Sequence, residues 1–342
     1  MRKLATVKVI DALHPIEGAD NIETAIVGGW NVVVKKGEHN VGQRIIMCEI
    51  DSWIPHNLAP FLTKEGHFPK VYNGVEGQKL KTAKLRGQLS QGLILPLEVL
   101  WSRGVSSVTD NEDVTEQLGI QKWEAPVSPE IAGLSRGSFP SLVPKTDQER
   151  IQNLTREFIQ WSGNPFFTWE QTEKLEGCSS TFYVDLDGIF HVCSRNINLK
   201  ESETNTFWKV AREYDIEGKI NDLGLFGIAI QGEIVGPGIE GNIYNLDRHK
   251  FFVYDVFDVQ KGFYTPKERH NLINTIDLPH VPIFDPFHII SGTVSDLLEV
   301  ADGMSIINPQ VKREGLVYKC NEMTVSFKTV SNNYLLKKKK EK

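Results

Sequence analysis

Three lysines in this sequence precede a glycine by three residues, and one of them has the setting expected of a nucleophile. The KxxG pattern occurs at Lys84, Lys174 and Lys312. Lys174 ends an aromatic, strand-like run, and a turn through Gly177 follows it. A lysine amine that attacks phosphorus must first lose its proton, and a rigid strand end would hold it beside a phosphate. The spacing alone is weak evidence, because an exposed lysine before a turn gives the same pattern.

Polar residues that could bind a nucleotide or a nucleic-acid end follow Lys174 along the chain. Arg195 and Asn196 come just after a predicted hairpin, where a guanidinium could form a forked contact with phosphate. Tyr254 lies in an aromatic strand and could stack on a purine. The other candidates are charged residues next to predicted strands: Glu233, Glu314 and Lys328. Each candidate has an ordinary alternative role as a turn carboxylate, a core residue or a surface lysine.

Several other chemistries are excluded by context. The stretch Gly236–Gly241 matches GxGxxG, but an aromatic strand rather than a helix follows it, which argues against a dinucleotide site. The sequence contains no Walker A motif and no histidine or cysteine cluster with zinc spacing. The four cysteines are widely spaced, which indicates free thiols in a reducing compartment: Cys48, Cys178, Cys193 and Cys320.

The elements that must position the candidates fall into two regions. Residues 1–120 contain short strand-like runs between glycine, proline and asparagine, which favours a small all-β barrel. These runs are Ala5–Ile10, Asn31–Val34, Arg44–Glu49 and Leu93–Leu97. Residues 126–145 hold four prolines and two glycines, which predicts a linker.

The second region mixes helices and strands. Thr146 and Glu149 form a capping-box pattern, and apolar residues at helical spacing follow it up to Trp161. We expect further helices at 206–223, 266–276 and 294–301. We expect strands at 167–170, 181–186, 189–193, 227–235, 251–257, 315–320 and 324–328. This order predicts an α+β domain rather than regular βαβ winding.

Composition places the chain among globular proteins of the cell interior. It has 342 residues, of which 40% are hydrophobic and 24% charged, and a formal net charge of -6. No apolar run is long enough to span a membrane and the N-terminus has no signal-peptide pattern, so we expect a cytoplasmic location. Two basic stretches stand out against the acidic total: residues 64–86, with a net charge of +4, and a lysine-rich tail at 337–342.

The order of the candidate motifs resembles the covalent nucleotidyltransferase superfamily, which contains DNA ligases, RNA ligases and mRNA capping enzymes. The matching pieces, which span residues 170–330, are Lys174–Gly177, Ser194–Asn196, Gly232–Glu233, Tyr254–Asp255, Glu314–Gly315 and Phe327–Lys328. The stretches 231–242 and 326–336 look more like RNA ligases. A β-barrel placed before the catalytic domain resembles nick-sealing RNA ligases of the Deinococcus/Naegleria type.

The resemblance implies a role for each residue in the nucleotide and RNA sites. Lys174 would attack the α-phosphorus of ATP and become lysyl-AMP. Tyr254 would stack on adenine, Glu173 would lie near its exocyclic edge, and Lys328 would neutralise the α-phosphate in the transition state. The residues implied at the ribose or the RNA end are Arg195, Asn196 and Glu233.

The resemblance also implies a divalent metal, Mg²⁺ or Mn²⁺. Three carboxylates would hold it through water: Glu176, Glu233 and Glu314. This sequence departs from the family pattern at two places, because Glu176 stands where many relatives have aspartate and Ser326 stands at the first lysine of a KxK motif. Both departures put the metal and phosphate contacts in doubt without changing the reaction class.

The N-terminal region has its own resemblance. His14–Glu23 and Lys79–Gly92 look like parts of tRNA-binding OB domains, whose barrels bind strands through basic grooves and stacking. Phe61, Phe68 and Tyr72 are interleaved with the basic stretch, and core packing explains them equally well.

We therefore predict an OB-type β-barrel at 1–125, a linker at 126–145, a mixed α/β nucleotidyltransferase domain at 146–336 and a basic tail at 337–342. The predicted activity is ATP-dependent joining of RNA 3′-hydroxyl and 5′-phosphate ends, at nicks in duplexes, by a monomer. One alternative is a DNA ligase or a capping-type guanylyltransferase. The other alternative is a non-catalytic RNA-binding protein that acts through its OB domain.

Overall fold

A computed structural model describes residues 3–124 and 133–337 of the chain. Internal contacts divide the chain into two compact units. Unit 1 comprises Met1–Pro126, Gln152–Thr155 and Leu335–Lys342, and unit 2 comprises Val127–Ile151 and Arg156–Tyr334. Among the described residues, no helix is long and apolar enough to cross a membrane.

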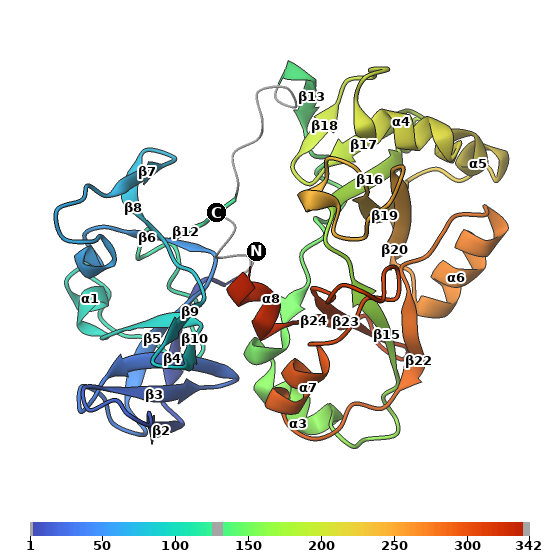
Figure 1. The fold of residues 1–342 in the computed structure, drawn as a ribbon. Coiled ribbons are helices and arrows are strands. Elements are labelled where there is room, and N and C mark those ends of the chain that lie inside the picture. Colours follow the sequence, from blue (N-terminus) through green and yellow to red (C-terminus); the bar gives the residue numbers. More distant parts are fainter. Residues whose placement is uncertain (1–2, 125–132, 338–342) are drawn as a thin grey trace. The chain divides into compact units, whose positions relative to one another are not determined.

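Unit 1 is built from short strands whose pairings are all antiparallel within the described residues (Figure 1). The strands are β1 (Ala5–Val9), β2 (Ala12–Pro15), β3 (Ile22–Val27), β4 (Trp30–Lys35), β5 (Arg44–Glu49), β6 (Ser52–Pro55), β7 (Lys70–Tyr72), β8 (Val75–Lys79), β9 (Ala83–Leu85), β10 (Gln88–Ser90), β11 (Gly92–Leu95) and β12 (Gln121–Lys122). They form sheets in the orders β1-β5-β11, β2-β3-β4, β12-β6-β8-β7 and β10-β9. Two short helices accompany them, η1 (Pro60–Leu62) and α1 (Glu98–Trp101).

Strand β5 links the two apolar clusters of unit 1, because its side chains alternate between the two faces of the strand. Ile46 and Cys48 belong to one cluster, and Ile45 and Met47 belong to the other. All four are buried. A strand buried on both faces needs a continuous apolar run, which explains why this segment lacks polar alternation.

Unit 2 contains two sheets and most of the helices (Figure 1). The seven-stranded sheet has the order β13-β18-β17-β16-β19-β20-β21. Its strands are β13 (Ser135–Ser138), β16 (Cys178–Val184), β17 (Phe190–Ser194), β18 (Ile197–Leu199), β19 (Ile228–Val235), β20 (Lys250–Asp258) and β21 (Gly262–Phe263). The five-stranded sheet, β14-β24-β23-β15-β22, comprises β14 (Glu149–Arg150), β15 (Trp169–Lys174), β22 (Ile283–His288), β23 (Gly315–Cys320) and β24 (Ser326–Val330). Its helices are α4 (Thr206–Glu213), α5 (Ile216–Asp222), η3 (Glu240–Asn242), α6 (Pro266–Thr275) and α7 (Val294–Val300). Three further helices include residues of both units: η2 (Ile151–Asn153), α3 (Thr155–Trp161) and α8 (Asn332–Lys337).

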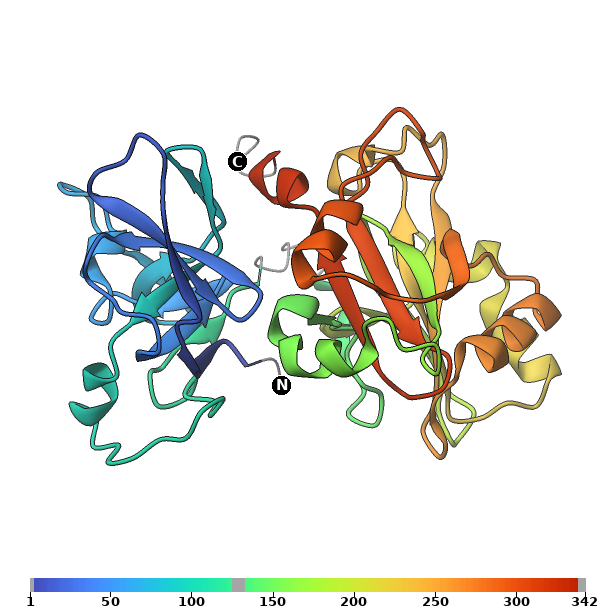
Figure 2. The same cartoon turned by 90° about the horizontal axis from the view of Figure 1, so that it is seen from below.

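Each sheet of unit 2 has one apolar face covered by helices. Side chains of α4, α5 and α6 pack with Phe182, Ile230 and Phe251 of the seven-stranded sheet. On the five-stranded sheet, Trp161 of α3 stacks with Phe327 of β24. Figure 2 shows the green helical segment that contains α3 next to the red strands of this sheet. Because side chains alternate along a strand, the residues between these apolar positions point to the opposite face. On the five-stranded sheet the opposite face carries Lys174 and Lys328.

The helix predicted to start at the Thr146 capping box is wrong at its beginning. Residues 149–150 form strand β14 instead, and α3 starts only at Thr155. The Thr146 hydroxyl is used elsewhere, because it bonds to the Ser179 hydroxyl at 2.7 Å. The capping pattern is local, and β14 pairs with β24, which lies far away in the sequence.

Other differences are smaller. The helix predicted over 206–223 is two helices, because Asp215 adopts φ +47° between them. Strand β22 was not predicted from the sequence. Part of the predicted linker, Ser135–Ser138, pairs with β18 as the edge strand β13. Residues 126–132 of that linker and 338–342 of the predicted basic tail lie outside the described residues. The domain limits themselves stay predictions.

We predict that Phe327→Ala destabilises the protein strongly. Phe327 is fully buried, and its ring centroid lies 5.0 Å from that of Trp169 and 4.9 Å from that of Tyr318. Removing a buried ring costs about 3–5 kcal/mol, which should lower the melting temperature by roughly 10 °C. The matched control is Phe166→Ala, because that ring is 81% exposed. Equal melting temperatures for the two variants would contradict this account of the core.

Candidate active site

The nucleophile candidate Lys174 forms an ion pair at the end of strand β15. Its Nζ atom lies 2.6 Å from the Glu314 carboxylate, and both side chains are partly buried. The pair is a product of strand register, because Lys174 sits opposite Gly315, which follows Glu314 at the start of β23. Strand pairing thus holds the Glu314 carboxylate beside Lys174, one of the three KxxG lysines.

Gly177 is required by packing against the other sheet. A Cβ atom at this position would lie 2.4 Å from the Ile234 carbonyl oxygen and 2.8 Å from the Glu233 side chain. Only glycine lets the turn after Lys174 approach β19 so closely. The turn therefore brings Lys174, on one sheet, close to Glu233, on the other.

Glu233 lies in a surplus of negative charge. The pKa of its carboxyl group is raised to about 8, chiefly by burial and also by the charge of Glu314, whereas Lys174 and Arg195 oppose the rise. Glu176 is held nearby, because its backbone N–H donates a 2.7 Å hydrogen bond to the Tyr244 hydroxyl. Two of the predicted metal carboxylates, Glu233 and Glu314, thus lie beside Lys174, and Glu176 follows in the turn. A divalent cation would balance their negative charge.

Lys328 shares the polar face of the five-stranded sheet with Lys174. It pairs with Val317 of β23, which pairs in turn with Thr172 of β15, two residues before Lys174. Residues that pair directly across strands point to the same face, as do residues two apart in one strand. Ser326 lies on this face too, where it bonds to Gln148. The structure therefore brings together the catalytic candidates Lys174, Glu314 and Lys328.

Tyr254 is anchored by a chain of hydroxyl groups. Its hydroxyl lies 2.7 Å from that of Ser179, which contacts the Thr146 hydroxyl. Burial raises the pKa of Tyr254, so it stays protonated at neutral pH. Lys319 lies 5.9 Å from the centre of the Tyr254 ring. These contacts fix the ring in the space that faces the five-stranded sheet.

Glu173 lies apart from the other candidates. It is buried and points to the face of the sheet opposite Lys174, where its carboxylate accepts a 2.8 Å hydrogen bond from the Ile306 backbone. Burial raises its pKa, while hydrogen bonds from Ser305 and Ile306 oppose the rise. The Glu173 carboxylate is therefore bound to the 305–306 loop, on the face of the sheet away from Lys174.

Arg195 and Asn196 face the segment that precedes β14. Arg195 forms a 2.5 Å ion pair with Asp147, and Asn196 accepts a 2.7 Å hydrogen bond from Lys145. The positive charge of Arg195 also lowers the pKa of Glu233, against the effect of burial. Both RNA-end candidates therefore lie on the seven-stranded sheet side of the site.

Buried charges farther along the same faces were missed by sequence reasoning. Lys319 bonds to Asp255, and Arg269 bonds to Glu170, with all four residues buried. Of these four residues, Asp255 lies inside one of the motifs identified from the sequence. For Arg269 and Glu170 no sequence signal exists, because a helix residue and a strand residue become partners only through the fold.

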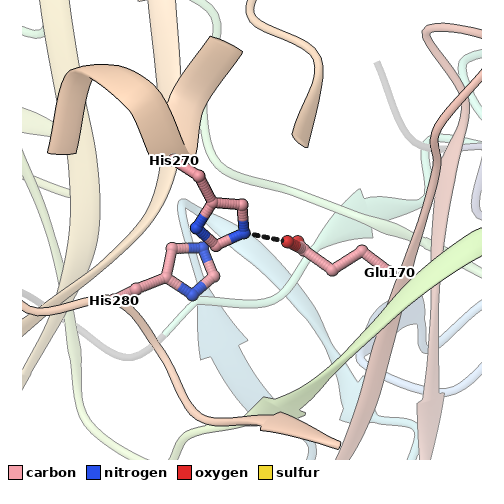
Figure 3. Close-up of side chains that lie close together, drawn as sticks. All are labelled: Glu170, His270 and His280. Carbon is pink, nitrogen blue, oxygen red and sulfur yellow. Dashed lines mark hydrogen bonds and ion pairs between the residues drawn. The ribbon is translucent and has the colours of Figure 1, made fainter. Parts of the chain in front are cut away.

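Glu170, His270 and His280 lie close enough together to suggest a metal site (Figure 3). Their ligand atoms are already engaged. Both carboxylate oxygens of Glu170 are bonded, one to Arg269 and one to His270, and His280 Nε2 accepts from Arg269 at 3.1 Å. Burial and the charge of Arg269 lower the pKa of His280 to about 3. The guanidinium already supplies the positive charge, so this cluster is a structural network rather than a cation site.

The polar faces of unit 2 can therefore do covalent chemistry at one end only. There the Lys174 amine lies beside Glu314 and Glu233, and Lys328 lies on the same face of the sheet. The partly buried Tyr254 ring lies near Glu233. At the other end the charges are paired internally. A nucleoside triphosphate with a divalent cation matches the first group of residues, since it offers a phosphorus for the amine and positive charge for the carboxylates.

Comparisons with known proteins agree with this chemistry. A family model described as RNA ligase matches residues 167–339, and a model described as an OB-fold domain matches residues 4–97. A comparison with curated proteins found no significant match. The matching OB-fold model confirms the predicted N-terminal fold, and the predicted α+β fold class is confirmed as well.

Solved structures of a Naegleria gruberi RNA ligase are similar over the whole chain. An apo aspartate variant is 41% identical, with 99% of each chain covered and a TM-score of 0.90. A lysine variant with ATP and manganese is 40% identical, with 98% of this chain and 99% of that chain covered and a TM-score of 0.88. A complex with pyrophosphate is 41% identical, with 99% and 100% covered and a TM-score of 0.89.

We predict that Glu233→Gln becomes more stable relative to the wild type as pH rises. The folded-state pKa of Glu233 is about 8, above its ordinary value of 4.5, so its ionisation disfavours the folded state. The stabilising contribution of the neutral carboxyl is complete below about pH 4.5 and is lost as pH rises towards 8. The melting temperature of Glu233→Gln minus that of the wild type should increase by a few degrees over this range in metal-free buffer.

The control for this measurement is Glu299→Gln, which removes an exposed carboxylate of the same unit. A difference between Glu233→Gln and the wild type that stays constant from pH 4.5 to 8 would show that Glu233 is not in the environment described.

Proposed function

This chain belongs to the RNA ligase family, and from that premise we propose that it is an ATP-dependent ligase that joins an RNA 3′-hydroxyl to a 5′-phosphate, chiefly at nicks in duplexes. The observation that carries the proposal is the 2.6 Å pair between Lys174 and Glu314, with Glu233 and Glu176 beside it. The similar ligase has been solved with ATP and manganese, with AMP and manganese, and with pyrophosphate. Pyrophosphate is the leaving group when an amine takes AMP from ATP.

The proposed reaction has three steps. The Lys174 amine attacks the α-phosphorus of ATP, a phosphoramide bond forms, and pyrophosphate leaves. The RNA 5′-phosphate then attacks that phosphorus and takes over the AMP, which restores the lysine. Finally the RNA 3′-hydroxyl attacks the 5′-phosphorus, and AMP leaves. Lys328, on the same face as Lys174, would neutralise negative charge that develops on the α-phosphate.

Glu176, Glu233 and Glu314 would hold a Mg²⁺ or Mn²⁺ ion, directly or through water. Such an ion supplies positive charge to the phosphate oxygens. The site fits it, since the carboxylates outnumber the nearby lysine and raise the pKa of Glu233 together with burial. Glu314 is shared between two partners, because its carboxylate also holds the Lys174 amine.

The remaining site residues would bind the substrates. Tyr254, fixed by Ser179, is the ring available for stacking on adenine. Arg195 and Asn196 would bind the ribose or the RNA end, with Arg195 exchanging Asp147 for a phosphate. Glu173 would reach the adenine edge only by giving up its contact with Ile306, so its proposed role is the weakest of the set.

Two alternatives compete with this function. A DNA ligase or capping-type guanylyltransferase would share the lysine chemistry, but the RNA ligase family match favours RNA as substrate. A non-catalytic RNA-binding protein would not need a lysine paired with a carboxylate beside two further carboxylates.

The first test places the chemistry on one lysine. Incubated with labelled ATP, the wild-type chain should carry label through a denaturing gel, and labelled GTP should give none. Lys174→Ala and Lys174→Arg should both abolish the label, because neither side chain can serve as an amine nucleophile. Given pre-adenylylated RNA, these variants should keep some sealing, since the last step does not use the free amine.

Lys84→Ala and Lys312→Ala serve as controls and should keep the label, because Lys84 lies in unit 1 and Lys312 pairs with Asp302. Labelling that survives in Lys174→Ala and disappears in Lys84→Ala would overturn the site. Labelling with GTP alone would overturn the choice of ATP.

For unit 1 we propose contact with the RNA duplex rather than chemistry. The structure separates the three aromatic residues of its basic stretch: Tyr72 packs 5.3 Å from Trp53, whereas Phe61 and Phe68 are 67% and 92% exposed. Lys84 and Arg86 are exposed on and beside the β9–β10 hairpin. Exposed cations and rings match a nucleic-acid surface, and the OB fold is a frequent carrier of one.

We predict that the double variant Lys84→Ala/Arg86→Ala binds nicked RNA more weakly, with lysyl-AMP formation unchanged. Each lost phosphate contact should flatten the plot of log affinity against log salt by nearly one unit. Lys35→Ala/Lys36→Ala removes the same charge from exposed positions outside the stretch and should have a smaller effect. If both double variants lost the same RNA affinity, the β9–β10 hairpin would contribute only its charge and not a specific contact with RNA.

A further inference from the structure

Helix α8 starts in the active site and is tied to it at its first turn. Ser331, just before the helix, donates its backbone N–H to the Glu314 carbonyl oxygen at 2.9 Å. Its hydroxyl and the Asn333 amide both donate to Asp302, at 3.1 and 2.6 Å. Lys312 bonds to the same carboxylate at 2.9 Å. The backbone of Glu314 and the start of α8 are therefore one rigid assembly.

This assembly brings Tyr334 to the carboxylates of the site. The Tyr334 hydroxyl bonds to the Glu176 carboxylate, and its other charged neighbours are Glu314 and Glu240. Its backbone N–H donates to the Ser331 hydroxyl at 3.2 Å, which sets the direction of the side chain. A tyrosine hydroxyl among carboxylates can act only as a hydrogen-bond donor to them.

Glu176 is thus held at two points by two tyrosines. Its backbone N–H donates to the Tyr244 hydroxyl at 2.7 Å, and Tyr244 itself is buried. Its side chain accepts from Tyr334. Glutamate has one more rotatable bond than aspartate, so a glutamate that must present an oxygen to a ligand needs more restraint. A donor on one carboxylate oxygen restrains the side chain and leaves the other oxygen for the ligand.

We propose that Tyr334 is a positioning residue, which orients the Glu176 carboxylate for the divalent cation and compensates for glutamate standing where many RNA ligases have aspartate. This inference rests on the proposed function. Tyr334 does not touch the reacting atoms. Its hydroxyl acts through Glu176, and its placement depends on the link from Ser331 to Glu314.

The test measures the cation directly. Mn²⁺ binding to the full chain with saturating AMP is followed by electron paramagnetic resonance, together with the Mn²⁺ concentration that gives half-maximal lysyl-AMP. Tyr334→Phe should weaken Mn²⁺ binding and raise that concentration by about ten- to a hundredfold, as for other partners of metal ligands. Tyr264→Phe, a partly buried tyrosine of the same unit, is the control and should change neither value.

A double-mutant cycle separates positioning from general damage. In Glu176→Asp the shorter side chain falls short of the Tyr334 hydroxyl, so adding Tyr334→Phe should cost no more than about twofold. The melting temperature of Tyr334→Phe reports separately on folding, since the ring is kept. An undiminished loss in the Glu176→Asp background, or wild-type Mn²⁺ binding in Tyr334→Phe, would overturn the inference and leave the ligase function standing. A wild-type chain that forms no lysyl-AMP or binds no Mn²⁺ would overturn the proposed function and this inference with it.

Discussion

The ion pair between Lys174 and Glu314 is the interaction around which the active site is organised. It exists because β15 and β23 are antiparallel neighbours with Lys174 opposite Gly315. A Cβ atom at Gly315 would lie 2.1 Å from the Thr329 carbonyl oxygen of β24, so this register depends on glycine there. The pairing of β15 with β23 consequently places the Glu314 carboxylate beside Lys174.

The charged residues between the two sheets of unit 2 are paired with one another at one end and are not balanced at the other. At the far end, Lys319 with Asp255 and Arg269 with Glu170 are buried pairs that satisfy one another. Breaking such a pair leaves an uncompensated buried charge, so these residues act as rigid structure. At the candidate active site, Glu233 and Glu314 lie beside Lys174, and negative charge is in excess of that one lysine. An incomplete balance is what a site needs if a cation and a polyphosphate are to complete it.

The glycines of this site allow neighbouring backbone segments to pack closely. At Gly177 a side chain would collide with Glu233 and Ile234, and at Gly232 it would collide with the Phe251 ring at 2.3 Å. Both glycines keep β19 in reach of the turn that follows the nucleophile. A lysine on one sheet and a glutamate on the other can meet only where the backbones themselves come close. The site therefore depends on core packing as much as on its charged residues.

The sequence by itself determined the fold class and the RNA ligase family, because the ordered motifs are local patterns. It also predicted Lys174 as the nucleophile among three KxxG lysines, from its strand-end position and the turn that follows. It left open whether Phe61, Phe68 and Tyr72 were core or surface, and it misplaced the start of α3. Only the tertiary structure decided the partners: Glu314 for Lys174, Tyr334 for Glu176, Arg269 for Glu170, and Trp53 for Tyr72. Such partners are distant along the chain, and their meeting depends on strand register and on packing between elements, which no local pattern records.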